Sequence, residues 1–362
     1  MYGDNVRVTM RKIRNTNIEI LRILSILGVI ILHYNNENMG GALAYTSDLA
    51  LNKFILLFFE CLSICSVNLF VLITGYFMCH NNNRNAFKPL KLIIEVVFFS
   101  LFFYAIEVLS GAEELSVDII LDKCVPNNYF VILYAALYGI SPYINIMLKN
   151  LSKYNFRKLI ITLISLFSIY PAVIELFSEI TGASISGLST IGMYGSQYGY
   201  TIINFALMYI IGAYIKINDI KLKGKIKNTL LYLLCAIGLL SWYYLGYFCS
   251  KDTSGSALAY FNPLCIYEAV LLFMLFKDMK INNSRIANFM ASGTFVVFLI
   301  HTNFIRFAKI ECFVVKSPIM MLCHLLISVV FIYCASTIVY FVYHMTFEKI
   351  IDYILRLHFQ KV

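Results

Sequence analysis

The sequence predicts an all-α integral membrane protein with about ten transmembrane helices and both termini in the cytoplasm. The chain has 362 residues, of which 60% are hydrophobic and only 14% are charged, whereas soluble domains carry about 25% charged residues. Its mean hydropathy is +0.76, and apolar runs recur along its whole length. A soluble fold could not bury this much apolar surface, so we expect the bilayer to be its solvent.

Apolar runs of membrane-spanning length define the expected elements. A hydrocarbon core of about 30 Å needs about 20 helical residues, and lipid-facing segments must satisfy their own backbone groups. Ten runs qualify: 17–36, 52–78, 90–110, 128–148, 158–177, 199–216, 229–248, 260–276, 292–310 and 317–345. The expected organisation is a cytoplasmic basic tail at 1–16, one transmembrane domain at 17–345 and a cytoplasmic amphipathic tail at 346–362.

The distribution of lysine and arginine predicts the orientation. Of the 29 Lys and Arg residues, 22 fall in tails and loops on the N-terminal side and 5 on the other side. This alternation agrees with the positive-inside rule. The net charge of +9 therefore reflects topology, and we expect no nucleic-acid partner. The outer side carries the acidic residues Glu37, Asp48, Glu113, Glu114, Asp118, Asp122 and Glu179.

Two segments leave alternatives open. Ala42-Leu43-Ala44 resembles a signal-peptide cleavage site after a basic and an apolar stretch. Because Asn35–Asn38 intervene and Arg22 interrupts the apolar run, we expect a retained first span. The outer loop at 178–198 is long and rich in Gly and Ser, so it is either a functional lid or, more commonly, a flexible linker.

The ten cysteines form no C-x-x-C pair and no metal-ligand cluster, so we expect no metal. Most lie inside apolar runs, where cysteine acts as a small hydrophobe. Cys124, Cys249 and Cys312 fall near outer loops, which leaves a disulfide among them open.

Two ionisable residues in the first span form the main functional hypothesis. Arg22 and His33 are eleven positions apart, which places them on one helix face. At 1.5 Å rise per residue, Arg22 lies about 6 Å and His33 about 22 Å into the membrane. Glu19 is three positions from Arg22, so the two can pair. The alternatives are an arginine that snorkels to the headgroups and an interfacial histidine with a local partner.

Further ionisable groups lie in other spans. His301 falls near mid-membrane in the ninth span, where it is either part of the acceptor path or a core histidine satisfied by a neighbouring helix. Glu60 and Glu268 are carboxylates that could hold the second nitrogen of His33 and fix its tautomer. The alternative for both is pairing with a lysine or with backbone groups.

These groups suit acyl transfer. A neutral imidazole is a good general base for a sugar hydroxyl that attacks a thioester, and it can also accept the acyl group itself. A guanidinium at the inner end suits a phosphate-bearing donor such as a coenzyme A thioester. The sequence contains no serine nucleophile elbow, Walker A motif, HExxH motif or dinucleotide fingerprint.

At these residues the chain resembles the integral-membrane acyltransferase type three family, which includes polysaccharide O-acetyltransferases. Arg22 and His33 fit its R/K-x10-H signature, and Asn17–Arg22 is similar to its "ELDxLR" motif. Asn68–Phe77 is similar to its "FFxLSGFL" motif, and Ser292–His301 to its "SxxsFxiYLiH" motif. Lys88-Pro89-Leu90-Lys91 stands where the family often has R-x-x-R.

The resemblance implies transfer of an acyl group, commonly acetyl, from acyl-coenzyme A to a hydroxyl of a surface or exported polysaccharide. It implies His33 as the essential residue and Arg22 as its functional partner. Lys88 and Lys91 are candidates for the donor phosphates, and His301, Glu60 and Glu268 are our candidate substrate-binding residues.

The expected partners are acyl-CoA, a surface glycan or lipid-linked sugar, and membrane lipids, with no permanently bound cofactor. The expected location is a bacterial plasma membrane. The alternative is a multi-pass transporter or flippase, a class that usually shows paired broken helices and internal repeats; the sequence shows neither.

Overall fold

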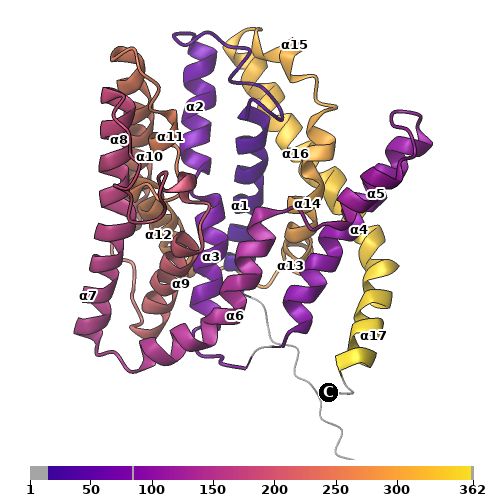
Figure 1. Cartoon of the computed structure of the whole chain (residues 1–362), viewed down its shortest axis with the longest axis horizontal. Helices are drawn as coiled ribbons and strands as arrows, with labels where there is room; N and C mark the ends of the chain where they lie inside the picture. The colour runs from indigo at the N-terminus through magenta and orange to yellow at the C-terminus, as the bar shows by residue number, and fades with distance from the viewer. Residues whose placement is uncertain (1–14, 84, 360–362) are drawn as a thin grey trace, which may run out of the picture.

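The computed structural model describes residues 15–83 and 85–359, and this part of the chain contains helices and no strands. The predicted basic tail at 1–16 lies almost entirely outside the described residues. Figure 1 shows the helices standing side by side, with α1 rising from the N-terminal side. We call the end of the molecule where α1 begins the Arg22 end and the opposite end the His33 end.

Most of the long apolar helices match the predicted spans. Within the described residues, seven helices or helix runs are long and apolar enough to cross a membrane. They are α1 (Thr16–Asn35), α2 with α3 (Leu51–Ser63 and Ser66–Met78), α4 (Phe87–Leu109), α5 with α6 (Val117–Cys124 and Tyr129–Lys149), α7, η1 and α8 (Lys153–Ile164, Ser165–Ile169 and Tyr170–Thr181), α10 (Lys225–Phe248) and α16 (Pro318–Met345).

A bent pair of helices is an eighth candidate span. Helices α13 (Arg285–Ser292) and α14 (Thr294–Ile305) are bent by 62° where they meet. Gly293 lies at this break, and a Cβ there would sit 2.5 Å from the ring of Tyr340. This bend was not predicted from the sequence, because the predicted span at 292–310 starts at the break and leaves α13 out.

Two other predicted spans are shorter than expected, so the count of ten stays a prediction. Helices α9 (Ile202–Ile217) and α12 (Pro263–Lys277) have 16 and 15 residues. Each begins after a loop, and these loops contact each other where Tyr260 N donates to Tyr198 O at 2.8 Å. Tyr260 is buried in its loop, whereas the side chain of Tyr198 is exposed. Figure 1 shows α9 and α12 starting below the tops of α8 and α10.

Short helices complete the fold. They are η2 (Gln197–Gly199), α11 (Ser254–Ala257), α15 (Ile310–Val314) and α17 (Phe347–Phe359). Helix α17 begins two residues after α16 ends and lies beside α4 at the Arg22 end (Figure 1). The predicted tail at 346–362 is therefore helical over its described residues.

All ten cysteines are free, so the disulfide left open among Cys124, Cys249 and Cys312 is not formed.

Glycines let the central helices approach closely. A Cβ on Gly75 of α3 would lie 2.1 Å from Tyr209 O of α9, and one on Gly212 of α9 would lie 2.2 Å from Leu72 O of α3. Small residues drive helix association in membranes because the lipid tails leave little hydrophobic driving force. This close backbone contact joins α3 to α9, and α1 packs against α3.

Candidate active site

His33 and His301 meet at the centre of the site. His33 Nδ1 lies 2.5 Å from His301 Nε2. The two rings are tilted by only 8°, with centroids 4.7 Å apart. Because that separation is close to the nitrogen–nitrogen distance plus two ring radii, the rings lie edge to edge rather than face to face. This is the geometry of an N–H···N hydrogen bond between two imidazoles.

Backbone geometry determines which nitrogen carries each proton. His301 Nδ1 lies 2.9 Å from Val297 O, and a carbonyl oxygen can only accept. His301 Nδ1–H is therefore the donor, which leaves the lone pair on His301 Nε2. That lone pair accepts from His33 Nδ1–H, so in neutral His33 the Nε2 atom has a free lone pair. His301 is 1% exposed, whereas His33 is half-buried and remains accessible.

Neither predicted carboxylate contacts His33. Glu60 accepts a hydrogen bond from Asn35 Nδ2 at 2.8 Å. Glu268 is fully buried, and both of its carboxylate oxygens lack a partner among the described residues. The partner of His33 is thus His301, for which the sequence left open the acceptor path or a core position satisfied by a neighbouring helix; a role of His301 on the acceptor path stays a prediction. A role of Glu60 or Glu268 in substrate binding stays a prediction.

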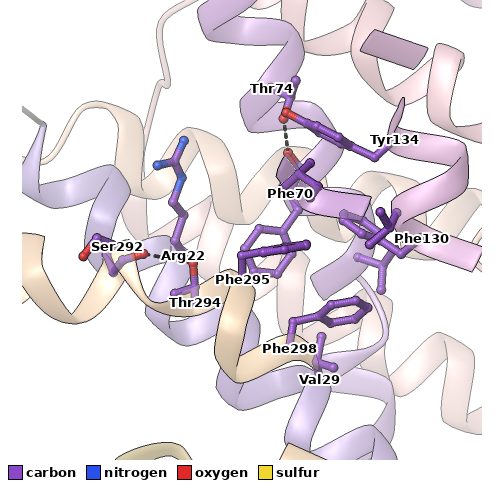
Figure 2. A pocket seen from close by; sticks show the side chains of 14 residues that line it. Arg22, Val29, Phe70, Thr74, Phe130, Tyr134, Ser292, Thr294, Phe295 and Phe298 are labelled. Atoms are coloured by element: carbon purple, nitrogen blue, oxygen red, sulfur yellow. Dashed lines mark hydrogen bonds between the residues drawn. The ribbon is translucent and has the colours of Figure 1, made fainter. Parts of the chain in front are cut away.

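Arg22 lies on the wall of a cavity. It pairs with Glu19 at 3.2 Å, as the sequence predicts, and its side chain is 33% exposed. The cavity measures about 270 Å³ and is also lined by Ser292, Thr294 and Phe295. Figure 2 shows the base of the Arg22 side chain near Ser292 and Thr294, with the guanidinium extending away from the cluster of phenylalanine rings. Arg22 therefore offers a positive charge to a group that enters this cavity.

The break between α13 and α14 adds positive potential to the same cavity. Thr294 and Phe295 are the first residues of α14 and line the cavity. The first N–H groups of a helix have no intrahelical partner, and the helix dipole places partial positive charge there. Arg22 and the start of α14 together suit an anionic or carbonyl oxygen.

Aromatic rings separate this cavity from the histidines. Val29, one turn before His33 on α1, lines the cavity together with Phe130 and Phe298. The Phe298 centroid is 5.1 Å from that of Phe130 and 6.2 Å from that of His301. Figure 2 shows Phe130, Phe298 and Val29 gathered together. The sequence did not single out these phenylalanines, because apolar residues in a span carry no distinguishing signal.

Lys91 is not a free cation in this structure. Its Nζ lies 2.6 Å from Glu348 Oε1 and 2.8 Å from Asp352 Oδ1, both on α17. Burial alone would raise the pKa of the Glu348 carboxyl, but hydrogen bonds from Lys91 and His344 lower that pKa below its usual value. Lys88 is exposed at the start of α4. Donor binding by either lysine stays a prediction.

Tyr34 and His324 support the end of α1, a contact that the sequence did not reveal. Tyr34 OH lies 2.8 Å from His324 Nδ1. His324 Nε2–H donates to Ala308 O at 2.9 Å, so the Tyr34 hydroxyl is the donor to Nδ1. This bond attaches the residue after His33 to α16.

Among the described residues, no group of three or more His, Cys, Asp or Glu side chains could hold a metal ion.

The comparisons with known proteins give the family of the chain. A family model described as an acyltransferase domain matches residues 15–341, which covers both histidines, Arg22 and the cavity between them. No curated protein and no solved structure matches the chain. Since the family model spans most of a multi-pass helical chain, the protein belongs to the acyltransferase 3 family.

Proposed function

We propose that this membrane acyltransferase moves an acyl group, with acetyl as the expected case, from a cytoplasmic acyl-coenzyme A to a hydroxyl of a surface or exported polysaccharide. The observation that carries the proposal is the hydrogen-bonded series Val297 O, His301 and His33. It leaves a lone pair on His33 Nε2. A neutral imidazole held in one tautomer is a suitable general base.

In the proposed reaction, His33 acts first as the general base and then as the general acid. The acceptor oxygen attacks the thioester carbonyl carbon while His33 Nε2 takes the hydroxyl proton. The carbon–sulfur bond then breaks, and the leaving thiolate takes the proton from His33. His301 stabilises the imidazolium because its Nε2 accepts from His33 Nδ1–H throughout. The same lone pair could instead take the acyl group first, which would give an acyl-imidazole before transfer.

The donor cavity supplies the second part of the proposal. Arg22 and the start of α14 hold the phosphate-bearing end or a carbonyl of the donor, and Glu19 orients the guanidinium. Arg22 and His33 are separated by about 16 Å along α1, from eleven residues at 1.5 Å each. The apolar cavity between them suits the extended arm of a coenzyme A thioester. Passage past Phe130 and Phe298 then delivers the thioester to His33.

The enzyme proposal accounts for more of the structure than a transporter does. A transporter usually contains two broken helices in corresponding positions, whereas the described residues contain one bent helix pair. A transporter also gives no reason for the fixed tautomer of His33. We place the protein in a cell membrane with the Arg22 end in the cytoplasm, following the distribution of Lys and Arg.

Acyl content of surface glycans tests this function. Cells that produce His33→Ala should show loss of glycan acetylation by mass spectrometry, with normal amounts of the protein in the membrane. His80→Ala is the matched control, because His80 is exposed beyond the end of α3 and should leave acetylation unchanged. Normal acetylation in His33→Ala would overturn the proposal. Acyl label retained on purified protein in the absence of acceptor would identify the acyl-imidazole route.

A further inference from the structure

A second cavity lies at the His33 end, outside the site described above. It measures about 490 Å³ and is lined by residues of α8 and of the loop between α8 and α9. This volume falls within the range of about 300–1,000 Å³ found for small-molecule sites. The loop is the 178–198 segment, for which the sequence left open a lid or a linker. It packs against α8 and the segment around α11 (Figure 1).

A buried hydroxyl without a partner marks the wall of this cavity. Ser196 is 1% exposed and lines the cavity, yet its Oγ has no hydrogen-bond partner among the residues that the structure describes. Its backbone N–H donates to Glu175 Oε1 at 2.6 Å, which fixes its position. Buried polar groups normally have partners, and an unpaired one costs stability. A ligand hydroxyl in the cavity would supply the missing partner.

The loop holds two tyrosines toward solvent at this cavity. Gln197 and Tyr198 have φ angles of 52° and 54°, a left-handed conformation that is uncommon outside glycine. Backbone strain of this kind clusters at binding sites. The Tyr198 carbonyl accepts from Tyr260 N at 2.8 Å, which anchors the strained turn. The side chains of Tyr194 and Tyr198 remain 78% and 57% exposed while lining the cavity.

The chemistry of these groups matches a sugar. Tyrosine offers an apolar ring face and a polar hydroxyl, which suit the C–H face and the hydroxyl groups of a pyranose. The carboxylates of Glu175 and Glu179 keep acceptor capacity for sugar hydroxyls. The described residues that line the cavity include no Lys or Arg, so an acidic sugar would meet uncompensated negative charge.

We propose that this cavity binds a neutral saccharide segment of the acceptor chain, remote from the hydroxyl that receives the acyl group. The proposal rests on the proposed function, because that function makes the acceptor a polysaccharide. Binding here holds the acceptor at the His33 end, where a second contact raises its local concentration near the histidines.

The single tryptophan of the chain provides a reporter for this cavity. Trp242 Nε1–H donates to Ser256 Oγ at 3.0 Å. Ser256 donates to Glu179 through its hydroxyl and, at 2.9 Å, through its backbone N–H. Because Glu179 lines the cavity, a sugar that binds its carboxylate perturbs the hydrogen bond of the indole.

Tryptophan fluorescence of the purified full-length protein, without acyl donor, tests the proposal. The probes are maltotetraose and tetra-N-acetylchitotetraose as neutral oligosaccharides, and tetragalacturonate as an acidic one. We expect saturable binding of at least one neutral probe and none of tetragalacturonate. Ser196→Ala should weaken that binding roughly three- to tenfold, the value of one hydrogen bond, without lowering Tm, since it removes an unpaired hydroxyl. Tyr198→Ala should weaken it by at least as much.

A matched control and separate readouts keep the two proposals apart. Tyr154→Ala removes a tyrosine that is 75% exposed on α7 and does not line the cavity, so it should bind like wild type. Absence of saturable binding by both neutral probes, preference for tetragalacturonate, or unchanged affinity in Ser196→Ala and Tyr198→Ala would overturn the site. Acyl transfer without such binding refutes only this site, and binding without acyl transfer refutes only the proposed function.

Discussion

His33 on α1 and His301 on α14 are 268 positions apart in the chain, and their ring nitrogens lie 2.5 Å apart. The carbonyl of Val297 fixes the proton on the far side of His301. The carbonyl oxygen of Val297 therefore determines, through His301, that Nε2 of neutral His33 carries no proton. This dependence makes His301 a positioning residue that can be tested apart from His33.

His301→Phe should lower kcat for acyl transfer by roughly 10²–10⁴-fold, the usual contribution of acid–base catalysis, because His33 loses the acceptor for its Nδ1–H. His301→Gln keeps an amide oxygen that can accept this bond, so it should recover part of the loss. Initial rates of coenzyme A release measure both, with KM for the donor nearly unchanged. His80→Gln serves as the control, because His80 is exposed beyond the end of α3 and should leave kcat unchanged. Equal rates for His301→Phe and wild type would contradict the positioning role.

Arg22→Gln should raise KM for the acyl donor about tenfold or more, because a charge-assisted hydrogen bond contributes about 1.5–3 kcal/mol. Steady-state kinetics with acetyl-CoA measure the change. Arg285→Gln is the matched control, since Arg285 begins α13 at the same end and does not line the cavity. If donor KM is the same in Arg22→Gln as in wild type, Arg22 serves as a membrane anchor only.

Phe298→Ala should widen the passage between the donor cavity and His301. The expected result is a higher rate ratio of butyryl-CoA to acetyl-CoA than in wild type, because the removed ring lies 5.1 Å from Phe130 across that passage. Competition between the two donors, analysed by mass spectrometry of the product, measures the ratio. Phe289→Ala is the control, as Phe289 packs on Tyr340 outside the cavity. An unchanged ratio would show that the thioester takes another route.

The attachment of α17 should weaken in acid. The pKa of Glu348 is lowered in the folded protein, so its stabilising contribution is present above the unfolded pKa and is lost as pH falls through the folded pKa. Hydrogen exchange in residues 347–359 should therefore increase as pH falls below the usual carboxylate range. Glu348→Gln should show the increase already at neutral pH, whereas Glu311→Gln should behave like wild type. If the difference in hydrogen exchange between Glu348→Gln and wild type were the same at every pH, this account would be contradicted.

Gly212→Ala should destabilise the protein by about 1–3 kcal/mol, the usual cost of overpacking, because the new Cβ meets the backbone oxygen of Leu72 at 2.2 Å. Gly139→Ala is the matched control on α6, where a Cβ meets nothing within 4 Å; it should be neutral or stabilising by up to about 1 kcal/mol. Thermal unfolding in detergent measures both. Equal Tm values for the two variants would contradict the close contact of α3 and α9.

The sequence predicted what depends on local geometry. The shared face of Arg22 and His33 and the pairing of Glu19 with Arg22 follow from helix periodicity alone. Hydropathy located the apolar helices because lipid exposure requires an apolar surface. The family resemblance, drawn from short motifs, was confirmed by the match over residues 15–341.

Tertiary packing decided what the sequence could not show. No local signal links His33 with His301, or Lys91 with Glu348, because these contacts join helices far apart in the chain. The starts of α9 and α12 were predicted three residues too early, since Tyr200 and Tyr260 are apolar enough to pass for helix while they lie in the loops before these helices. The bend at Gly293 depends on the Tyr340 ring that fills the space beside it.

The shortness of α9 and α12 changes the barrier that an acyl group would cross in the proposed reaction. At 1.5 Å per residue, helices of 16 and 15 residues span about 24 and 22 Å, less than the hydrocarbon core of about 30 Å. Along these two helices the protein is therefore about 6–8 Å thinner than the hydrocarbon core around it. The fold itself shortens the crossing by that distance, and Arg22 and His33 on α1 cover about 16 Å of what remains.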